Sequence, residues 1–580
     1  MPDRSRCDVV IVGFGAAAGP LAVELSRAGF SVVALERGGE LPPESEVRQG
    51  LDTLVYGTRG RFTPSFADQP LVFRPQPQAG ATPHHNRMPS LVGGGSMLQA
   101  AYGWRYYEDD FGLASTLPQR YGVARLAYLA EDGAAIADWP ITYAELEPYY
   151  ERAERCVGVG GWPGNLRGTI RPVRPDEGNP FEAPRENDYP FRPLRDSATS
   201  LTIRGGALRL GLHPFHSPAA ITSERYTSPY GITREACTYC GFCSGHICWN
   251  GAKSSTVVAM LPAAEATGNF ELRSRCHVIR VCHQGAQATG VEYVDESGQV
   301  WTQPADLVIL AAYTLQNVRL LLHSQIIEHG LVGRYFINRA GPLVFGAFAD
   351  RDLNGYSGPG AQSQSVDDFN GENAAEAKLR LPPDDFFVRG ALIYNVGQRH
   401  PLEVCRSVPD EVPRWGASYK AFLRRSFTRL VMLYVQGEAL PYDDSVLDLD
   451  PRYSDRHGMA ALRVTRAAKR NEVRMARYMY QRGAAILLAA GATRVWGRDT
   501  PVSVATMTHD VGGCRMGPSP DRSVTNRYGQ VWGIPNLFIA GGAVFPSISG
   551  HNPTLTIWAL AYWMADAIVR GRASPGTSRV

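Results

Sequence analysis

An apolar run and a glycine-rich turn stand close to the start of the chain. Asp8 is followed by Val-Val-Ile-Val and then by Gly13-Phe-Gly15, after which a helix-like pattern extends to Ala28. A second apolar run, from Phe30 to Leu35, follows at once. Strand, turn, helix and strand in this order predict a β-α-β unit, whose two strands lie parallel.

The residues of this unit predict a dinucleotide site. Gly13 and Gly15 leave room for a pyrophosphate close to the backbone, where the amides at the start of the helix point at the phosphates. Gly19 would let the helix pack tightly on the strand. Glu36 lies 21 residues after Gly15, at the end of the second apolar run, and suits the hydroxyls of a ribose. The motif by itself does not distinguish FAD from NAD.

A second glycine-rich turn reads Val92-Gly93-Gly94-Gly95-Ser96. In isolation such a turn is more typical of an ordinary loop. Together with the first motif, however, it predicts that Gly93, Gly94 and Ser96 bring backbone close to the same cofactor.

The composition excludes several classes of partner. A net charge of +3 over 580 residues gives no reason to expect nucleic acid or an acidic membrane surface. No run reaches about 18 uninterrupted apolar residues, so we expect no membrane span. The apolar stretch from Thr554 to Val569 contains Asp566 and fits a buried helix better. The first residues lack the apolar stretch of a signal peptide.

Periodicity and caps predict the other main elements. Thr142 and Glu145 form the pattern of a capping box at the start of a helix that should extend to Cys156. The glycine-rich, polar segment 353–378 is typical of a long surface loop or a lid. The remaining predictions are strands at Glu271–Val281, Ala288–Val294 and Asp306–Leu310, helices at Leu315–Ser324 and Thr465–Ala490, and sheet at Ala417–Glu438.

Two segments near the end carry candidate catalytic groups. His509 precedes a glycine turn, and a histidine near neutral pH can take the proton that an alcohol must lose when its hydride leaves. Asn552 precedes Pro553, so it could cap a helix that starts at the site. Residue chemistry alone favours the alternative that His509 is a turn histidine and Asn552 only a cap, because lone histidines are usually structural. His551 competes with His509 for the role of base.

Four of the ten cysteines lie within twelve residues, at positions Cys237, Cys240, Cys243 and Cys248. Such a cluster can surround an iron–sulfur group or a zinc ion, because thiolates are ligands for both. It differs from the ferredoxin pattern, which has a shorter last spacing and a trailing proline. Unliganded thiols are the third alternative.

These motifs together resemble the glucose-methanol-choline (GMC) oxidoreductases, and the resemblance runs nearly end to end. It is carried by the two glycine turns, by Asp138-Trp-Pro-Ile-Thr, by His509-x-x-Gly-Gly-Cys-x-Met-Gly517 and by Asn552-Pro-Thr. Asn179-Pro-Phe-Glu-Ala-Pro-Arg185 and Cys237-Thr-Tyr-Cys-Gly-Phe-Cys243 are similar to one branch, the membrane-associated sugar dehydrogenases that include the gluconate 2-dehydrogenase flavoprotein.

The resemblance implies FAD, with His509 as base and Asn552 as its partner, and it adds Val278, Gly541 and Thr554 to the cofactor-binding residues. Some relatives attach the flavin through a histidine where this chain has Leu98, so the FAD is expected to be non-covalent. The implied fold class is α/β, with a Rossmann-like FAD domain interleaved with an α+β substrate domain built on an antiparallel sheet. The expected FAD-domain segments are 1–155, 217–340 and 500–575, and the substrate-domain segments are 156–216 and 341–499.

The resemblance also implies a [3Fe-4S] cluster held by three of the four clustered cysteines. Cys243 and Cys248 match best, and Cys237 and Cys240 compete for the third position. Electrons would pass through this cluster to a cytochrome c-type acceptor. A small partner subunit would carry the flavoprotein across the membrane, which gives a periplasmic location; without such a partner the location would be cytoplasmic.

The leading hypothesis is therefore an FAD-dependent dehydrogenase that acts on a hydroxyl of a sugar or sugar acid. An oxygen-using alcohol or pyranose oxidase is the second hypothesis. The third is a non-catalytic electron-transfer subunit that keeps a bound flavin.

Overall fold

The glycine-rich start of the chain forms the predicted β-α-β unit. In the computed structural model, which describes residues 3–42, 47, 62–84, 88–170, 178–327, 330–501 and 508–571, β1 (Cys7–Val12) leads into α1 (Ala18–Arg27). β2 (Val32–Leu35) follows and lies parallel to β1. All four residues of β2 are buried, as expected for the inner part of a parallel sheet.

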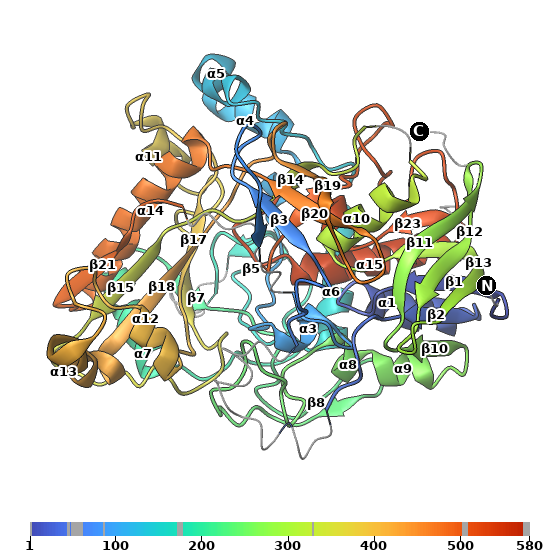
Figure 1. Ribbon diagram of the computed structural model, residues 1–580. Coiled ribbons are helices and arrows are strands. Elements are labelled where there is room, and N and C mark those ends of the chain that lie inside the picture. Colours follow the sequence, from blue (N-terminus) through green and yellow to red (C-terminus); the bar gives the residue numbers. More distant parts are fainter. Residues whose placement is uncertain are drawn as a thin grey trace.

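This unit is the centre of a seven-stranded sheet assembled from distant parts of the chain (Figure 1). Its order is β10-β2-β1-β13-β12-β11, with β23 also paired to β13. β1 and β23 both lie parallel to β13, so strands from the start, middle and end of the chain share one edge at their carboxyl ends. The added strands are β10 (Phe270–Arg273), β11 (His277–Gln284), β12 (Gln287–Val294), β13 (Val300–Leu310) and β23 (Leu537–Ile539).

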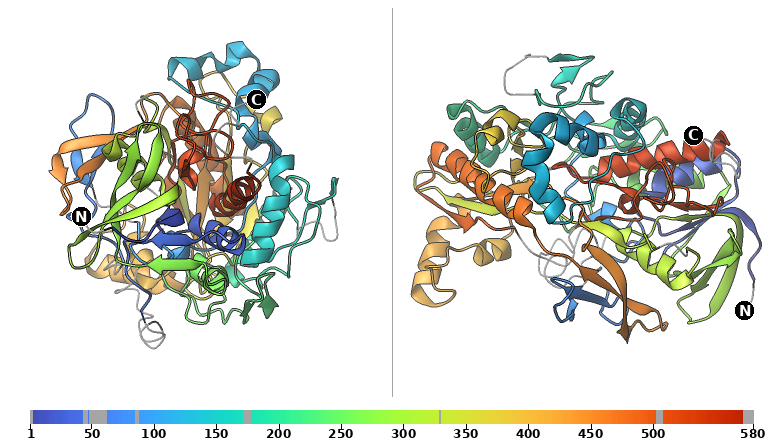
Figure 2. Two further views of the ribbon diagram at one scale, coloured as in Figure 1. Left: turned by 90° about the vertical axis from the view of Figure 1, so that its right-hand side faces the viewer. Right: turned by 90° about the horizontal axis from the view of Figure 1, so that it is seen from above.

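Helices from distant parts of the chain pack around this sheet. α15 (Thr554–Val569) packs against α1 and against α6 (Tyr143–Val157). Figure 2 shows α15 and α1 side by side. α15 is the predicted buried apolar helix, with Trp558 and Tyr562 fully buried. α10 (Thr314–Ser324) packs against β11. No helix in the described ranges combines the length and apolar character that a membrane crossing requires.

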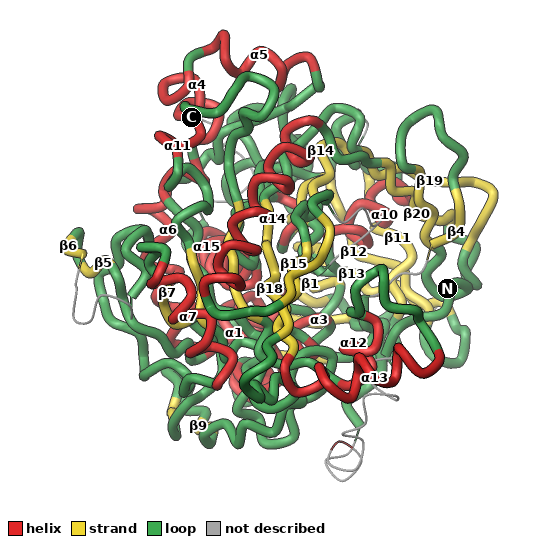
Figure 3. The backbone as a smooth tube through the Cα atoms, turned by 90° about the vertical axis from the view of Figure 1, so that its left-hand side faces the viewer, coloured by secondary structure: helices red, strands yellow, loops and turns green. Residues whose placement is uncertain are grey.

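A six-stranded antiparallel sheet lies at the opposite side of the molecule. Its order is β21-β15-β18-β17-β16-β7, and α14 (Arg470–Ala489) packs across β15 and β18 (Figure 3). The predicted fold class is confirmed by this arrangement of a mostly parallel sheet and an antiparallel one. The strands are β7 (Pro214–His216), β15 (Leu343–Ala347), β16 (Gln364–Val366), β17 (Ala391–Asn395), β18 (Leu430–Gly437) and β21 (Arg494–Arg498).

A second six-stranded sheet has the order β22-β14-β19-β20-β3-β4. Its strands are β3 (Leu71–Arg74), β4 (Thr82–His84), β14 (Arg334–Ile337), β19 (Val446–Ser454), β20 (Ala460–Thr465) and β22 (Val511–Gly513). The other α-helices among the described residues are α3 (Gly95–Leu98), α4 (Leu113–Tyr121), α5 (Val123–Glu131), α7 (Ala198–Arg209), α8 (Thr256–Ala259), α9 (Leu261–Glu265), α11 (Ala375–Leu379), α12 (Pro401–Arg406) and α13 (Gly416–Ser426). The predicted domain boundaries remain a prediction.

Several local predictions are confirmed. The capping box at the start of α6 is present, because the Thr142 side chain accepts from the Glu145 amide and the Glu145 carboxylate accepts from the Thr142 amide. The predicted helix Leu315–Ser324 is α10, and the predicted strand Ala288–Val294 is β12.

Three local predictions are wrong. The run Glu271–Val281 is two strands, β10 and β11, separated at Arg275, which has a positive φ of 54°. The first half of Ala417–Glu438 is helix α13, and only its second half is strand β18. Segment 353–378 is not a surface loop, since residues 358–367 are buried and contain β16. Distant segments supply partners to its buried Asp367, which accepts from Tyr107 and Asn179.

Candidate active site

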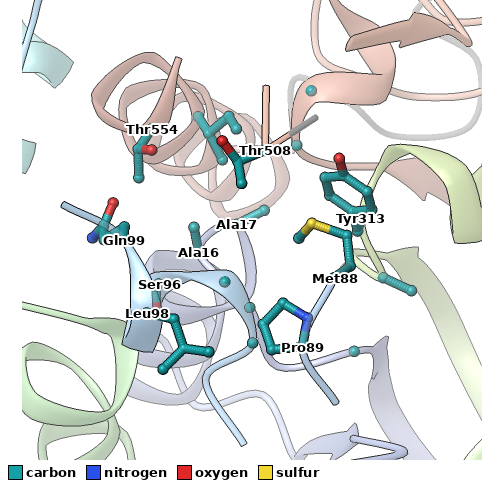
Figure 4. A pocket seen from close by; sticks show the side chains of 18 of the residues that line it. Ala16, Ala17, Met88, Pro89, Ser96, Leu98, Gln99, Tyr313, Thr508 and Thr554 are labelled. Atoms are coloured by element: carbon teal, nitrogen blue, oxygen red, sulfur yellow. The ribbon is translucent and has the colours of Figure 1, made fainter. Parts of the chain in front are cut away.

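A cavity of about 800 Å³ lies at the carboxyl ends of the parallel strands and extends to the antiparallel sheet. Crevices at this edge are the usual ligand sites of such sheets, and the volume is typical of a site for a cofactor or another small molecule. In Figure 4, Ala17 before α1, Ser96 on α3 and Thr554 at the start of α15 approach from three distant segments. The predicted site residues on its wall are Gly13, Gly15, Glu36, Gly94, Ser96, Val278, His509, Gly541, Asn552 and Thr554.

The first glycine turn is shaped by close backbone contacts on one side and by the cavity on the other. Gly13 has a φ of +88°, and a Cβ there would lie 2.7 Å from the Cα of Ala312. A Cβ at Gly15 would meet no protein atom within 4 Å, because this position opens onto the cavity. Gly15 therefore leaves space for a ligand rather than for the protein itself.

Glu36 holds the same turn in place. Its Oε2 accepts from the Phe14 amide at 2.8 Å, and its Oε1 accepts from the Gly38 amide at 2.7 Å. Each carboxylate oxygen has a further lone pair. Glu36 can thus support the turn and still accept from ribose hydroxyls in the cavity.

The second glycine turn packs directly on the first. The Gly93 amide donates to the Phe14 carbonyl at 2.9 Å, and Ser96 Oγ donates to the Gly93 carbonyl at 2.7 Å. Gly93 itself does not line the cavity, whereas Gly94 and Ser96 do. The two motifs that the sequence singled out are therefore one continuous cradle.

Gly19 has a packing role, but not against the strand as predicted. A Cβ at Gly19 would lie 2.4 Å from the Sδ of Met260 and 2.8 Å from a methyl of Thr256. The close approach is thus between α1 and the segment at α8, because these side chains fill the space beside Gly19.

His509 and Asn552 lie side by side on the cavity wall. Asn552 Nδ2 is 2.9 Å from His509 Nε2. The side chain of Asn552 does not cap α15, whose N-cap is Pro553, so the interpretation of Asn552 as a cap only is wrong. Gln436 on β18 fixes the amide by donating to Asn552 Oδ1 at 2.9 Å and to the Gly550 carbonyl at 2.7 Å.

Both ring nitrogens of His509 face hydrogen-bond donors. Arg339 Nε donates to Nδ1 at 3.1 Å, and the Asn552 amide nitrogen faces Nε2. Burial, and then the positive charge of Arg339, lower the pKa of His509 well below its ordinary value. The ring is therefore neutral at neutral pH and can accept from only one of the two donors at a time. The form with its proton on Nδ1 presents a lone pair at Nε2, as a base requires.

Arg339 and Gln436 were not predicted from the sequence. Arg339 follows β14 and Gln436 lies on β18, and neither stands in a recognisable motif. Arg339 also donates to the backbone carbonyls of Ser549 and His551, which connects His509 to the segment that carries Asn552.

The ring of His551 does not reach this cavity. It lines a separate hollow of about 20 Å³, beside Trp104 and Arg105. The structure therefore brings His509, and not His551, to the wall of the large cavity.

The four clustered cysteines are not gathered as ligands. Within the described ranges, no group of three or more His, Cys, Asp or Glu side chains could hold a metal ion. Cys243 is buried and Cys240 is exposed. Burial raises the pKa of Cys243 to about 12 and that of Cys237 to about 11. As placed, these residues do not fit a cluster, although Ser244 and Gly245 of the same loop line the cavity.

Comparison with known proteins agrees with the site. Residues 231–339 and 441–561 match the N-terminal and C-terminal parts of the GMC oxidoreductase family. The gluconate 2-dehydrogenase flavoprotein of Pantoea cypripedii is 32% identical over 98% of this chain and 94% of its own length. The chain belongs to the GMC oxidoreductase family.

Two further proteins resemble this GMC oxidoreductase at lower sequence identity. The fructose dehydrogenase large subunit of Gluconobacter japonicus is 26% identical, with 97% of each chain covered. The crystal structure of pyridoxine 4-oxidase from Mesorbium loti superposes with a TM-score of 0.59 at 17% identity, over 97% of this chain and 99% of the other, which shows the shared fold. The predicted enzyme class, an FAD-dependent oxidoreductase acting on CH–OH groups, is confirmed by the family.

Proposed function

We propose that this GMC oxidoreductase is a dehydrogenase that oxidises a hydroxyl of a sugar or sugar acid, with FAD held non-covalently. The observation that carries the proposal is the pairing of His509 with Asn552 on the wall of the cavity that also contains both glycine turns. One continuous space can therefore hold the cofactor and bring a hydroxyl to a titratable side chain.

The residues at the cradle end fit FAD. Gly15 leaves its side of the turn open, and Glu36 has lone pairs for a ribose. The amides at the start of α1 lie beside Gly15, where a pyrophosphate would be stabilised. Leu98 lines the cavity and is aliphatic, so it has no atom that could form a covalent bond to the flavin.

The residues at the other end fit a hydroxyl group. When bound, FAD supplies the acceptor for the hydride that leaves the carbinol carbon. His509 with its lone pair on Nε2 takes the hydroxyl proton, and the Asn552 amide donates to the same oxygen as negative charge develops there. The alcohol thus loses one hydride and one proton and becomes a carbonyl. Arg339 must release Nδ1 for this form of the ring, because Nδ1 then carries a proton.

Anaerobic addition of a panel of sugars and aldonates to the purified holoenzyme tests this function. We expect at least one of them to bleach the flavin, with slow reoxidation by oxygen and fast turnover with artificial acceptors. Rapid peroxide formation would favour the oxidase hypothesis. Bleaching by none of the compounds would favour the non-catalytic flavin subunit. Acid precipitation should release the FAD into the supernatant, because no covalent bond holds it.

We propose separately that three of the four clustered cysteines hold a [3Fe-4S] cluster in the mature enzyme, with Cys237 and Cys240 competing for the third position beside Cys243 and Cys248. The spacing supports this, and so does the position of their loop beside the cavity. The thiols would have to turn toward one another, so no step of the reaction is assigned to the cluster. Iron and acid-labile sulfide in the purified protein, both lost in a Cys243→Ser variant, would support the cluster; iron-free protein with full activity would rule it out.

The electron acceptor and the location follow as further proposals. A relative is itself the large subunit of a fructose dehydrogenase. We propose that this chain works with a small exported subunit and a cytochrome c-type acceptor at the periplasmic face. Fractionation of cells that express the chain alone, or with its genomic neighbours, tests this: a cytoplasmic location in both cases would contradict it.

A further inference from the structure

His551 differs from His509 in what faces its ring. Its Nδ1 lies 2.8 Å from the backbone carbonyl of Arg105, and its Nε2 lies 2.9 Å from Oδ2 of Asp367. A carbonyl oxygen only accepts, so Nδ1 must carry a proton. The charge state of the ring therefore depends on whether Asp367 also accepts.

Asp367 accepts from every other partner that it has in the described part of the chain. The Tyr107 hydroxyl and the Asn179 amide, at 2.7 Å, both donate to the oxygen that faces His551. The Asn370 amide donates to the other oxygen at 2.9 Å. Both carboxyl oxygens of Asp367 therefore act as acceptors toward these donors. His551 must then supply a proton from each nitrogen, which makes its ring an imidazolium.

The surroundings of the ring favour the charged form. It stacks on Trp104, with 5.1 Å between ring centres and 7° between planes, and it also contacts Tyr107. Aromatic faces attract cations. Burial alone would lower the pKa of His551, but the charge and hydrogen bond of Asp367, with a smaller effect from Asp110, raise it above its ordinary value.

The other charged groups near this ring are already engaged. The Arg105 guanidinium pairs with Glu147 and Glu154, and only its backbone carbonyl faces His551. The Arg339 guanidinium donates to the backbone carbonyl of His551, not to its ring.

We infer that His551 is a charged positioning residue for Asn552: its imidazolium ties the backbone beside Asn552 to Arg105 and Asp367, so that the Asn552 amide faces His509. The ring itself does not touch the cavity, so it acts through its neighbour. Arg339 holds the same segment from the other side through the carbonyls of Ser549 and His551. The role rests on the proposed function of His509 and Asn552.

The pH profile of kcat tests this role. Loss of the second proton from His551 should release the segment, so kcat of the wild type should fall on the alkaline side. Asp367→Asn removes the charge that keeps the ring protonated, and we expect this alkaline limb to move to lower pH by about one unit or more, with a smaller change in KM. His551→Gln should lower kcat and abolish the limb.

Asp368→Asn is the matched control, because it removes the same charge from the next residue, whose partner His213 is exposed. It should leave the limb in place. An alkaline limb that is unchanged in Asp367→Asn would overturn the inference.

A second measurement keeps the inference testable if the variants fold poorly or if no sugar is oxidised. In ¹⁵N-histidine NMR spectra of the wild-type holoenzyme, one histidine should keep both nitrogens protonated above the ordinary pKa range of histidine, and its signals should be absent from His551→Gln. Absence of such a histidine from the wild type would refute the imidazolium. Failure of every sugar to bleach the flavin would instead refute the proposed function.

Discussion

Alanine at Gly15 should impair cofactor binding without destabilising the protein, whereas alanine at Gly19 should do the reverse. The two glycines stand four residues apart in the same unit, and each substitution adds one methyl group. At Gly15 that methyl meets no protein atom within 4 Å and points into the cavity. At Gly19 it would lie 2.4 Å from Met260 and 2.8 Å from Thr256.

The magnitudes follow from these contacts. Overpacking by a methyl group costs about 1–3 kcal/mol, so Gly19→Ala should lower the free energy of unfolding of the apoprotein by about that amount. Gly15→Ala should change it by less than about 0.5 kcal/mol, since nothing is displaced. If the added methyl instead overlaps the bound pyrophosphate at a similar cost, FAD should bind about 5- to 150-fold more weakly.

Denaturant unfolding of the two apoproteins and titration of their FAD binding by flavin fluorescence measure both quantities. Wild-type affinity for FAD in a folded Gly15→Ala variant would refute the placement of the pyrophosphate at this turn. Unchanged stability of Gly19→Ala would refute the tight packing of α1 on the segment at Thr256.

Three further predictions concern the His509 end of the site and the cofactor. The Arg339→Gln side chain can accept a hydrogen bond from a proton on Nδ1 of His509, which favours the form of the ring that acts as base, whereas the Arg339→Lys side chain can only donate. At neutral pH we therefore expect a higher kcat for the Gln variant than for the Lys variant. The opposite order would show that Arg339 acts through its charge. Burial and Arg339 lower the pKa of His509 in the folded protein. The neutral ring therefore stabilises the fold at pH values above the ordinary pKa of histidine, and this stabilisation is lost as the pH falls. The difference in Tm between wild type and His509→Gln should shrink on acidification. Glu36→Gln replaces one acceptor of the Phe14 and Gly38 amides by a donor, which should weaken FAD binding by about 1.5–3 kcal/mol, measurable by the same fluorescence titration.

Features that are coded locally could be predicted from the sequence. The β-α-β unit depends on the period of its apolar residues and on its glycines, and the start of α6 depends on Thr142 and Glu145. Both depend on residues close together in the chain. The resemblance to GMC oxidoreductases then placed His509 and Asn552 in one site, although they are 43 residues apart.

Features that depend on distant partners could not be predicted. Asp367 lies in a glycine-rich, polar segment of the kind that usually marks a surface, yet it is buried because Tyr107, Asn179 and His551 satisfy it from 184 to 260 residues away. Likewise, no pattern in the residues next to Arg339 in the sequence indicates its contact with His509. The residues of helix α13 predict sheet instead, because aromatic residues such as Tyr419 and Phe422 favour strands in isolation.

The rate at which a sugar bleaches the flavin in wild type and in His509→Ala tests the central claim most directly. The variant should retain FAD, because His509 is not part of the cradle. With the best substrate from the panel under anaerobic, single-turnover conditions, we predict bleaching about 10²- to 10⁴-fold slower than in the wild type. Equal bleaching rates in the two proteins would contradict the account, since the hydroxyl proton would then leave without His509.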